Sequence, residues 1–274
     1  MNDQFSLGVR QRFGAGWEAA ITGSYQRGRN GYTNLFATRR NNGLGDCCDT
    51  SPVAPFGYAN VIIGYDGLDT RYKALYVTLD KNYTTASGWG VNIAYTLSKG
   101  EQNGNDLFSL DGTVPDSYGW RPRTGDERHR LVVSGIVDLP WDLRFSTLST
   151  FGSGRAYQVT DATNGFGNGQ LVITSAYPEK TCIAGVFAFC EVNLTLAKLF
   201  KIGGDHEVEL AVDLLNAFDN KNYADFDGFF NNNPGSIDAL NPANGEFNPA
   251  TNNFNANSIL TLPRRIQLRA AYRF

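Results

Sequence analysis

Apolar and polar residues alternate with a period of two along much of this 274-residue chain. Strict alternation is typical of a β-strand whose two faces meet different environments. In the final stretch, RRIQLRAAYRF, apolar residues at every second position oppose arginine and glutamine. The pattern predicts nine strands, over residues 4–13, 17–26, 71–83, 88–99, 128–139, 142–151, 189–200, 206–216 and 263–274.

The connections between these strands alternate between short and long. The short ones cover residues 13–16, 84–87, 140–141 and 201–205, and the long ones cover 27–70, 100–127, 152–188 and 217–262. Several long loops without structure would be unusual in a compact soluble domain. A transmembrane β-barrel has tight turns at one rim and long loops at the other. The pattern therefore predicts an all-β, antiparallel barrel portion with short periplasmic turns and long extracellular loops.

The charges of the last strand predict which face meets lipid. If Arg265, Arg269 and Arg273 faced hydrocarbon, each would cost about 2–4 kcal/mol near the midplane. With Ile266 and Leu268 facing outward, this penalty disappears. We therefore expect the three arginines to face the barrel lumen.

Aromatic residues and two lysines gather beside the short turns. Lys81 and Lys198 fall on the apolar face but close to a turn, where a lysine can extend to lipid head groups. An aromatic girdle is expected at this level of a barrel. Its predicted members are Phe13, Trp17, Tyr83, Trp89, Trp141, Phe200 and Phe274.

Composition narrows the class of protein further. The chain has 30 Gly, 18 Phe and 13 Tyr, which favour strands joined by many turns. A net charge of -3 gives no attraction to nucleic acid. No apolar run is long enough for a transmembrane helix, but barrel strands give a weaker signal. The first residues, MNDQFSLGVRQRF, do not form an export signal.

Candidate chemistry is sparse. Two histidines allow no convincing catalytic or zinc arrangement, so we expect no enzyme activity, no metal centre and no cofactor. The motif GDERHR, residues 125–130, is interpreted as a solvated strand start. The oxygen-rich loop 219–238 lacks the spacing of a calcium hand. The four cysteines are the neighbours Cys47 and Cys48, then Cys182 and Cys190. Cys182 and Cys190 either close a small disulfide loop or remain free thiols.

Five stretches resemble the C-terminal part of TonB-dependent outer-membrane receptors, most closely the Oar-like subgroup. They are YKALYVTLDKNYTTASGWGVNIAYTLSKG, GDERHRLVVSGIVDLPW, STFGSGRAY, NLTLAKLFKIGGDHEVELAVDLLNAFDNKNY and LPRRIQLRAAYRF, and they follow one another between residues 70 and 274. The resemblance implies a 22-stranded barrel, closed by an N-terminal plug, that imports a scarce nutrient with energy passed through TonB. It also implies that the barrel-assembly machinery reads the last strand through Phe274.

An odd number of strands leaves the chain ends on opposite sides of the membrane, whereas bacterial barrels use an even number. Residues 1–274 are therefore expected to be the C-terminal portion of such a barrel, in contact with outer-membrane lipid, without plug or signal peptide. TonB would be reached only through the plug.

The charged residues of the last two strands are the candidate site. An antiparallel hairpin would bring Glu207 near Arg273, and Asp213 near Arg265 or Arg269. One interpretation is a lumen patch that contacts the plug or a passing substrate; the other is cross-strand ion pairing in a wet wall. The members are Glu207, Glu209, Asp213, Arg265, Arg269 and Arg273.

Uptake of a siderophore, peptide or glycan is the function that the resemblance implies, and the ligand itself stays open. Two alternatives remain: an outer-membrane protein of adhesion or export, and a soluble all-β binding module.

Overall fold

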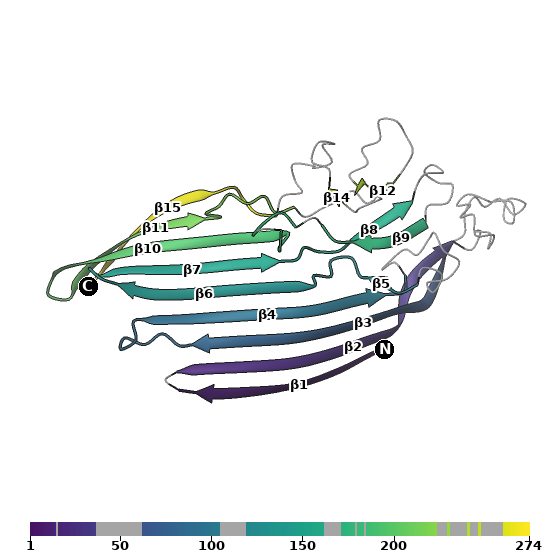
Figure 1. Cartoon of the computed structure of the whole chain (residues 1–274), viewed down its shortest axis with the longest axis horizontal. Coiled ribbons are helices and arrows are strands. Elements are labelled where there is room, and N and C mark those ends of the chain that lie inside the picture. The colour runs from purple at the N-terminus through teal and green to yellow at the C-terminus, as the bar shows by residue number, and fades with distance from the viewer. Residues whose placement is uncertain are drawn as a thin grey trace, which may run out of the picture.

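Nine long strands form one antiparallel sheet in which each strand pairs with its neighbours along the chain (Figure 1). The computed structural model describes residues 1–14, 16–36, 62–104, 119–161, 171–178, 180–183, 185–223, 229–230, 240–241, 246–247 and 260–274. The nine predicted strands are confirmed. They are β1 (Asn2–Phe13), β2 (Trp17–Phe36), β3 (Ile62–Lys81), β4 (Trp89–Gln102), β6 (His129–Leu139), β7 (Leu143–Gly152), β10 (Phe189–Gly203), β11 (His206–Leu215) and β15 (Arg265–Arg273).

The short connections all lie at one end of the sheet, on the left of Figure 1, and the described parts of the long connections lie at the other end. The N-terminus lies at the end of the long connections and the C-terminus at the end of the short turns. The turn between β6 and β7 has Trp141 and Asp142 at φ 66° and 54°. Consecutive residues with positive φ are typical of hairpin turns whose twist matches that of their strands.

The register places the apolar residues of neighbouring strands on one face. Leu7, Gly23, Leu75 and Leu97 form one continuous row across β1 to β4. At the other edge of the sheet, Leu196, Val212 and Leu268 share the same face. Many of these side chains are exposed, Leu268 by 77%. An apolar face that no part of the described chain covers is expected for a wall in contact with lipid.

The β2–β3 hairpin is longer than predicted. Its strands continue to Phe36 and from Ile62, although the sequence predicted a loop from residue 27 to residue 70. The register shifts twice, between Gly28 and Gly31 and again between Gly31 and Thr33. Because a bulge changes which face the next residue points to, the alternation of apolar residues is lost there while strand pairing continues.

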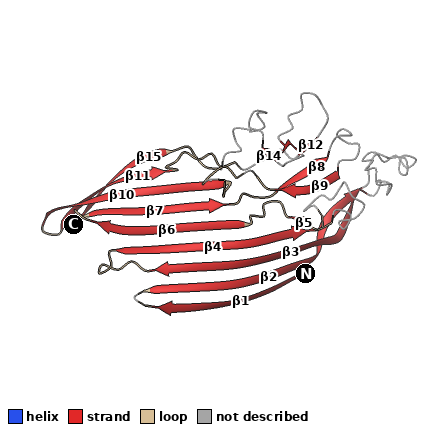
Figure 2. Ribbon diagram, in the orientation of Figure 1, coloured by secondary structure: helices blue, strands red, loops and turns tan. Residues whose placement is uncertain are grey.

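Several short strands at the end of the long connections were not predicted. β5 (Arg121–Pro122) pairs with β4, and β8 (Tyr157–Asp161) pairs with β9 (Leu171–Ala176) and β12 (Phe229–Phe230). β13 (Leu240–Asn241) pairs with β14 (Glu246–Phe247). The described residues contain no helix (Figure 2), and hence none long and apolar enough to cross a membrane.

Candidate functional site: the lumen wall and its two rims

The predicted charged residues of β11 and β15 share one face of the sheet. Arg269 donates to Asp213 through Nε and Nη2, at 3.0 and 3.2 Å. Arg273 donates to Glu209 at 2.9 Å. The Oγ1 of Thr195 in β10 also donates to Asp213, at 2.6 Å. These contacts form a polar network across three strands.

The pairing within this network is diagonal. Glu207 and Arg273 are partners in the register, as the hairpin geometry predicted, but the ion pair of Arg273 is made with Glu209. Arg269 lies opposite Ala211 and reaches Asp213 two residues away. Arg265 lies opposite Leu215 at the other end of the pairing. Diagonal neighbours are within reach of long side chains in an antiparallel pair.

The polar wall continues across the sheet toward β6. A groove of about 420 Å³ lies between the charged residues of β11 and β15 and those of the β6–β7 hairpin. There Arg144 donates to Asp138 at 2.7 Å. At the far edge of the sheet, Arg12 and Glu18 form a further pair between β1 and β2, at 2.7 Å. Paired charges that stay in water form a hydrated wall that a polar ligand or a polypeptide could contact, and each pair alone adds little stability.

Two predictions about the short-turn rim are refined. Lys81 was expected to reach lipid head groups, but it is only 8% exposed. Its ammonium group donates to Ser87 Oγ at 2.9 Å and to the Trp89 carbonyl at 2.7 Å, and it lies 4.0 Å from the Trp89 ring centroid. Groups of the protein, rather than lipid head groups, therefore stabilise the Lys81 ammonium group. Lys198 likewise donates to the carbonyl of Trp141.

Three of the seven predicted girdle residues form a chain of ring contacts. Phe13 stacks on Trp17, which meets Trp89 edge-on with ring centroids 5.8 Å apart. Tyr83 has a different partner, because its hydroxyl donates to Asp138 on the lumen face at 2.5 Å. That hydrogen bond raises the pKa of Tyr83.

The GDERHR motif was expected to be a solvated strand start. It is instead held by hydrogen bonds to other segments at the long-loop end of the sheet. Asp126 is 8% exposed and accepts hydrogen bonds from the Gly100 amide and the Tyr177 hydroxyl, each at 2.6 Å. Desolvation, together with this bond to Asp126, raises the pKa of Tyr177. Burial also raises the pKa of the neighbouring Tyr157 to about 12.

The histidine of this motif, His129, lies on the membrane-facing side, as alternation predicted, and contacts Tyr95 at 2.7 Å.

Cys182 and Cys190 form a disulfide at the same rim. The side chain of Asn222 makes two hydrogen bonds to the backbone of Cys190. It accepts one from the Cys190 amide and donates one to the Cys190 carbonyl, both at 2.8 Å. Cys47, Cys48 and most of the oxygen-rich loop 219–238 lie outside the described residues. Among the residues that are described, no three His, Cys, Asp or Glu side chains gather as a metal site.

An antiparallel meander with one uncovered apolar face, one ion-paired face and aromatic residues at the turns defines the wall of a membrane β-barrel. The comparison with protein families agrees: residues 1–185 match the family described as outer membrane beta barrel domain, and the chain belongs to this family. The protein is therefore an outer-membrane barrel protein, and the soluble binding module considered from the sequence no longer stands.

Solved structures of outer-membrane transporters show a distant likeness. The chain is similar to the outer membrane transporter YddB from Escherichia coli, with 10% identity and a TM-score of 0.48 over 81% of this chain and 29% of that chain. It is also similar to the copper transporter OprC, with 12% identity and a TM-score of 0.46 over 98% of this chain and 30% of that chain. It thus spans about three tenths of each. No curated protein matches the sequence.

Proposed function

We propose that this chain is the C-terminal barrel portion of a TonB-dependent receptor of the Oar-like subgroup, which takes up a scarce nutrient. The observation that carries the proposal is the ordered series of receptor-like stretches between residues 70 and 274. These stretches overlap the long strands from β3 to β15, which are consecutive neighbours in the sheet.

The charged face of the sheet supports a role in the passage of a nutrient through the barrel. Its arginines are accessible to water, with the Arg269 side chain 51% and the Arg273 side chain 61% exposed, and they cover the carboxylates with which they pair. Mixed, paired charges on a wet surface suit reversible contact with a polar ligand or with a plug domain, since neither contact requires burial of an unpaired charge. In the proposed 22-stranded barrel, this wall would face the plug.

The open edges of the sheet are consistent with a larger barrel. In the described residues, β1 and β15 each pair on one side only. Lipid does not satisfy free backbone groups, so a strand edge in a bilayer requires a partner strand. We infer that further strands of the receptor pair with β1 and β15, and that the assembly machinery recognises β15 and Phe274.

Uptake assays in the host bacterium test the function. Deleting the segment that encodes residues 1–274 should abolish uptake of one nutrient among a panel of siderophores, peptides and glycans. Loss of TonB should cause the same defect, and the two deletions together should add nothing. Unchanged uptake of the whole panel, with weaker attachment of cells to surfaces, would instead support the adhesion alternative.

The wall itself is tested by a matched pair of variants in the complete receptor. Asp213→Asn together with Arg269→Gln removes one lumen ion pair, and we expect slower uptake at normal surface abundance. Leu268→Ala on the opposite face is the control and should leave uptake unchanged. Equal uptake by both variants would show that this part of the wall does not contact plug or ligand.

A further inference from the structure

The membrane-facing side of β1 to β4 changes from apolar to basic near the long-loop end. Phe5, Tyr25, Lys73 and Lys99 are register partners across the four strands and form one row. The next row toward the turns consists of Leu7, Gly23, Leu75 and Leu97. The two lysines therefore sit directly beyond an apolar row, on the face that meets lipid.

The depth of this row is close to the outer boundary of the hydrocarbon. Eight residues separate Lys73 from Lys81 at the short-turn rim. At about 3.3 Å per residue and a strand tilt of about 40°, they span roughly 20 Å of membrane thickness. The apolar band of such barrels is about 25 Å tall. Lys73 and Lys99 thus lie about 5 Å inside the outer boundary of the apolar band, close enough for their side chains to extend to the head groups.

The charges around the row are predominantly positive. Glu101 accepts from Arg71 at 2.7 Å and pairs with Lys99 at 2.8 Å, and Arg27 lies 3.8 Å from Asp69. Arg128 adds a fifth cation, and its Nη1 donates to the Ser98 carbonyl at 3.1 Å. The Arg29–Asp3 ion pair lies beside Arg27. Six cations against three carboxylates leave this patch positive, although the whole chain carries a net charge of -3.

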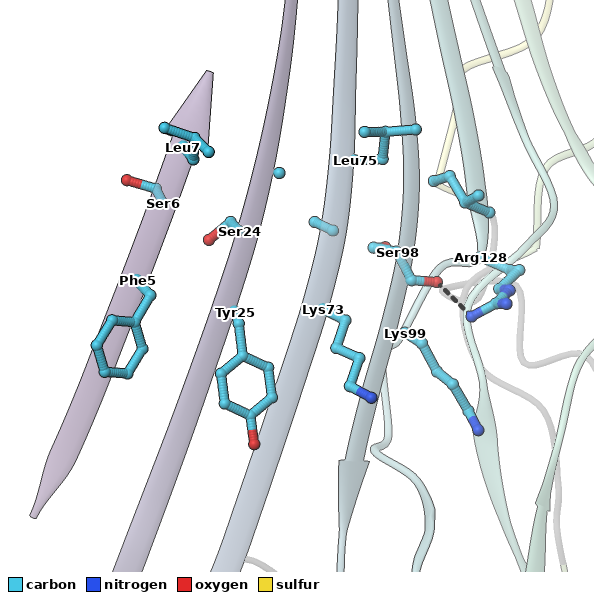
Figure 3. Close-up of a pocket in the computed structure, with 13 residues that line it drawn as sticks. Phe5, Ser6, Leu7, Ser24, Tyr25, Lys73, Leu75, Ser98, Lys99 and Arg128 are labelled. Carbon is cyan, nitrogen blue, oxygen red and sulfur yellow. Dashed lines mark hydrogen bonds between the residues drawn. The ribbon is translucent and has the colours of Figure 1, made fainter.

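A groove in the apolar row leads to the lysines. It has a volume of about 590 Å³ and is lined by both rows. Gly23 opens it, because a Cβ built there would meet only the Leu7 carbonyl oxygen, at 3.9 Å, between the side chains of Leu7 and Leu75. In Figure 3 the side chains of Tyr25, Lys73 and Lys99 extend from this groove toward the end of β4, beside Arg128.

We propose that this groove binds one phosphate-bearing lipid of the outer leaflet. Its phosphate is held by Lys73, Lys99 and Arg128, and one acyl chain lies over Gly23 between Leu7 and Leu75. Basic residues at the boundary of a membrane attract anionic head groups. A soluble anion would use the lysines but gain nothing from the apolar groove, which opens toward acyl chains.

Lipid binding to the receptor, purified from outer membranes in detergent, tests the proposal by native mass spectrometry. The probes are bisphosphorylated lipid A, the same lipid without phosphates, and phosphatidylethanolamine. We expect selective binding of bisphosphorylated lipid A, because phosphatidylethanolamine carries an ammonium group that offsets the charge of its phosphate. Lys73→Ala with Lys99→Ala should weaken it about thirtyfold, since each of the two surface cations contributes about one kcal/mol to attraction of an anionic head group. Lys201→Ala at the other rim is the matched control.

A second variant separates the two parts of the site. Gly23→Leu fills the groove and should weaken lipid A binding without changing the heat-modifiable mobility that reports a folded barrel. Inorganic phosphate should fail to displace the lipid at equal concentration. Equal binding of phosphorylated and dephosphorylated lipid, displacement by free phosphate, or full binding by the double lysine variant would each overturn the proposal.

Discussion

At the scale of single residues, Asp126 shows that side chains distant in sequence set the chemistry of a rim position. Its partners are the Gly100 amide, near the end of β4, and the Tyr177 hydroxyl, in the connection after β9. The motif GDERHR alone contains neither partner, so the sequence could suggest only a solvated strand start. Predicting this buried carboxylate would have required knowing that the connections after β4 and β9 meet.

Tyr177 is predicted to ionise well above its ordinary pKa of 10.0, because desolvation and the nearby Asp126 both disfavour the phenolate. The folded state therefore holds this proton more tightly than the unfolded state does. The resulting stability is complete below pH 10.0 and is lost as the pH rises through the higher folded value. The ultraviolet titration curve of the wild type should differ from that of Tyr177→Phe by one tyrosine that ionises at a higher pH than the others.

Asp126→Asn provides the control for this assignment, because it removes the negative charge and keeps an acceptor of similar shape. The pKa of Tyr177 should then move back toward its ordinary value, though not fully, since burial remains. A tyrosine that titrates normally in the wild type would contradict the rim contact.

At the scale of elements, the strands were predictable where alternation is unbroken and unpredictable where it is not. Residues 17–26 and 206–216 alternate cleanly, and their strands form as expected. The continuation of β2 past Gly28 was missed because its bulges shift the alternation. Lys81 and Tyr83 were misjudged for a related reason: at a strand end the turn, rather than the alternation, decides where a side chain points.

The β3–β4 turn gives a prediction at this scale. A Cβ on Gly90 would lie 2.6 Å from the Tyr83 amide nitrogen and 3.0 Å from the Lys81 carbonyl. Gly90→Ala should therefore displace the turn and lower the free energy of unfolding by about 1–3 kcal/mol. Gly135→Ala is the control, because its new Cβ would have no neighbour closer than 3.7 Å. Urea unfolding in lipid vesicles measures both, and equal midpoints would refute the close contact.

At the scale of the whole molecule, the sheet is organised by its two solvents rather than by a core. In the described chain, the fully or nearly buried apolar residues are few and mostly small, whereas Leu7, Ile266 and Leu268 are highly exposed. A single layer of strands can be stable in this state only if lipid covers one face and water the other. The charged residues of β11 and β15 then lie on the face that meets water in the lumen.

Spin labels on β15 test this arrangement most directly. Single cysteines at Leu268 and Gln267, neighbours on opposite faces, would carry the label in the complete receptor reconstituted in vesicles. We predict that the label at position 268 collides with lipid-soluble oxygen and the label at position 267 with a water-soluble nickel chelate. The reverse pattern would mean that the apolar face of the sheet does not face the bilayer.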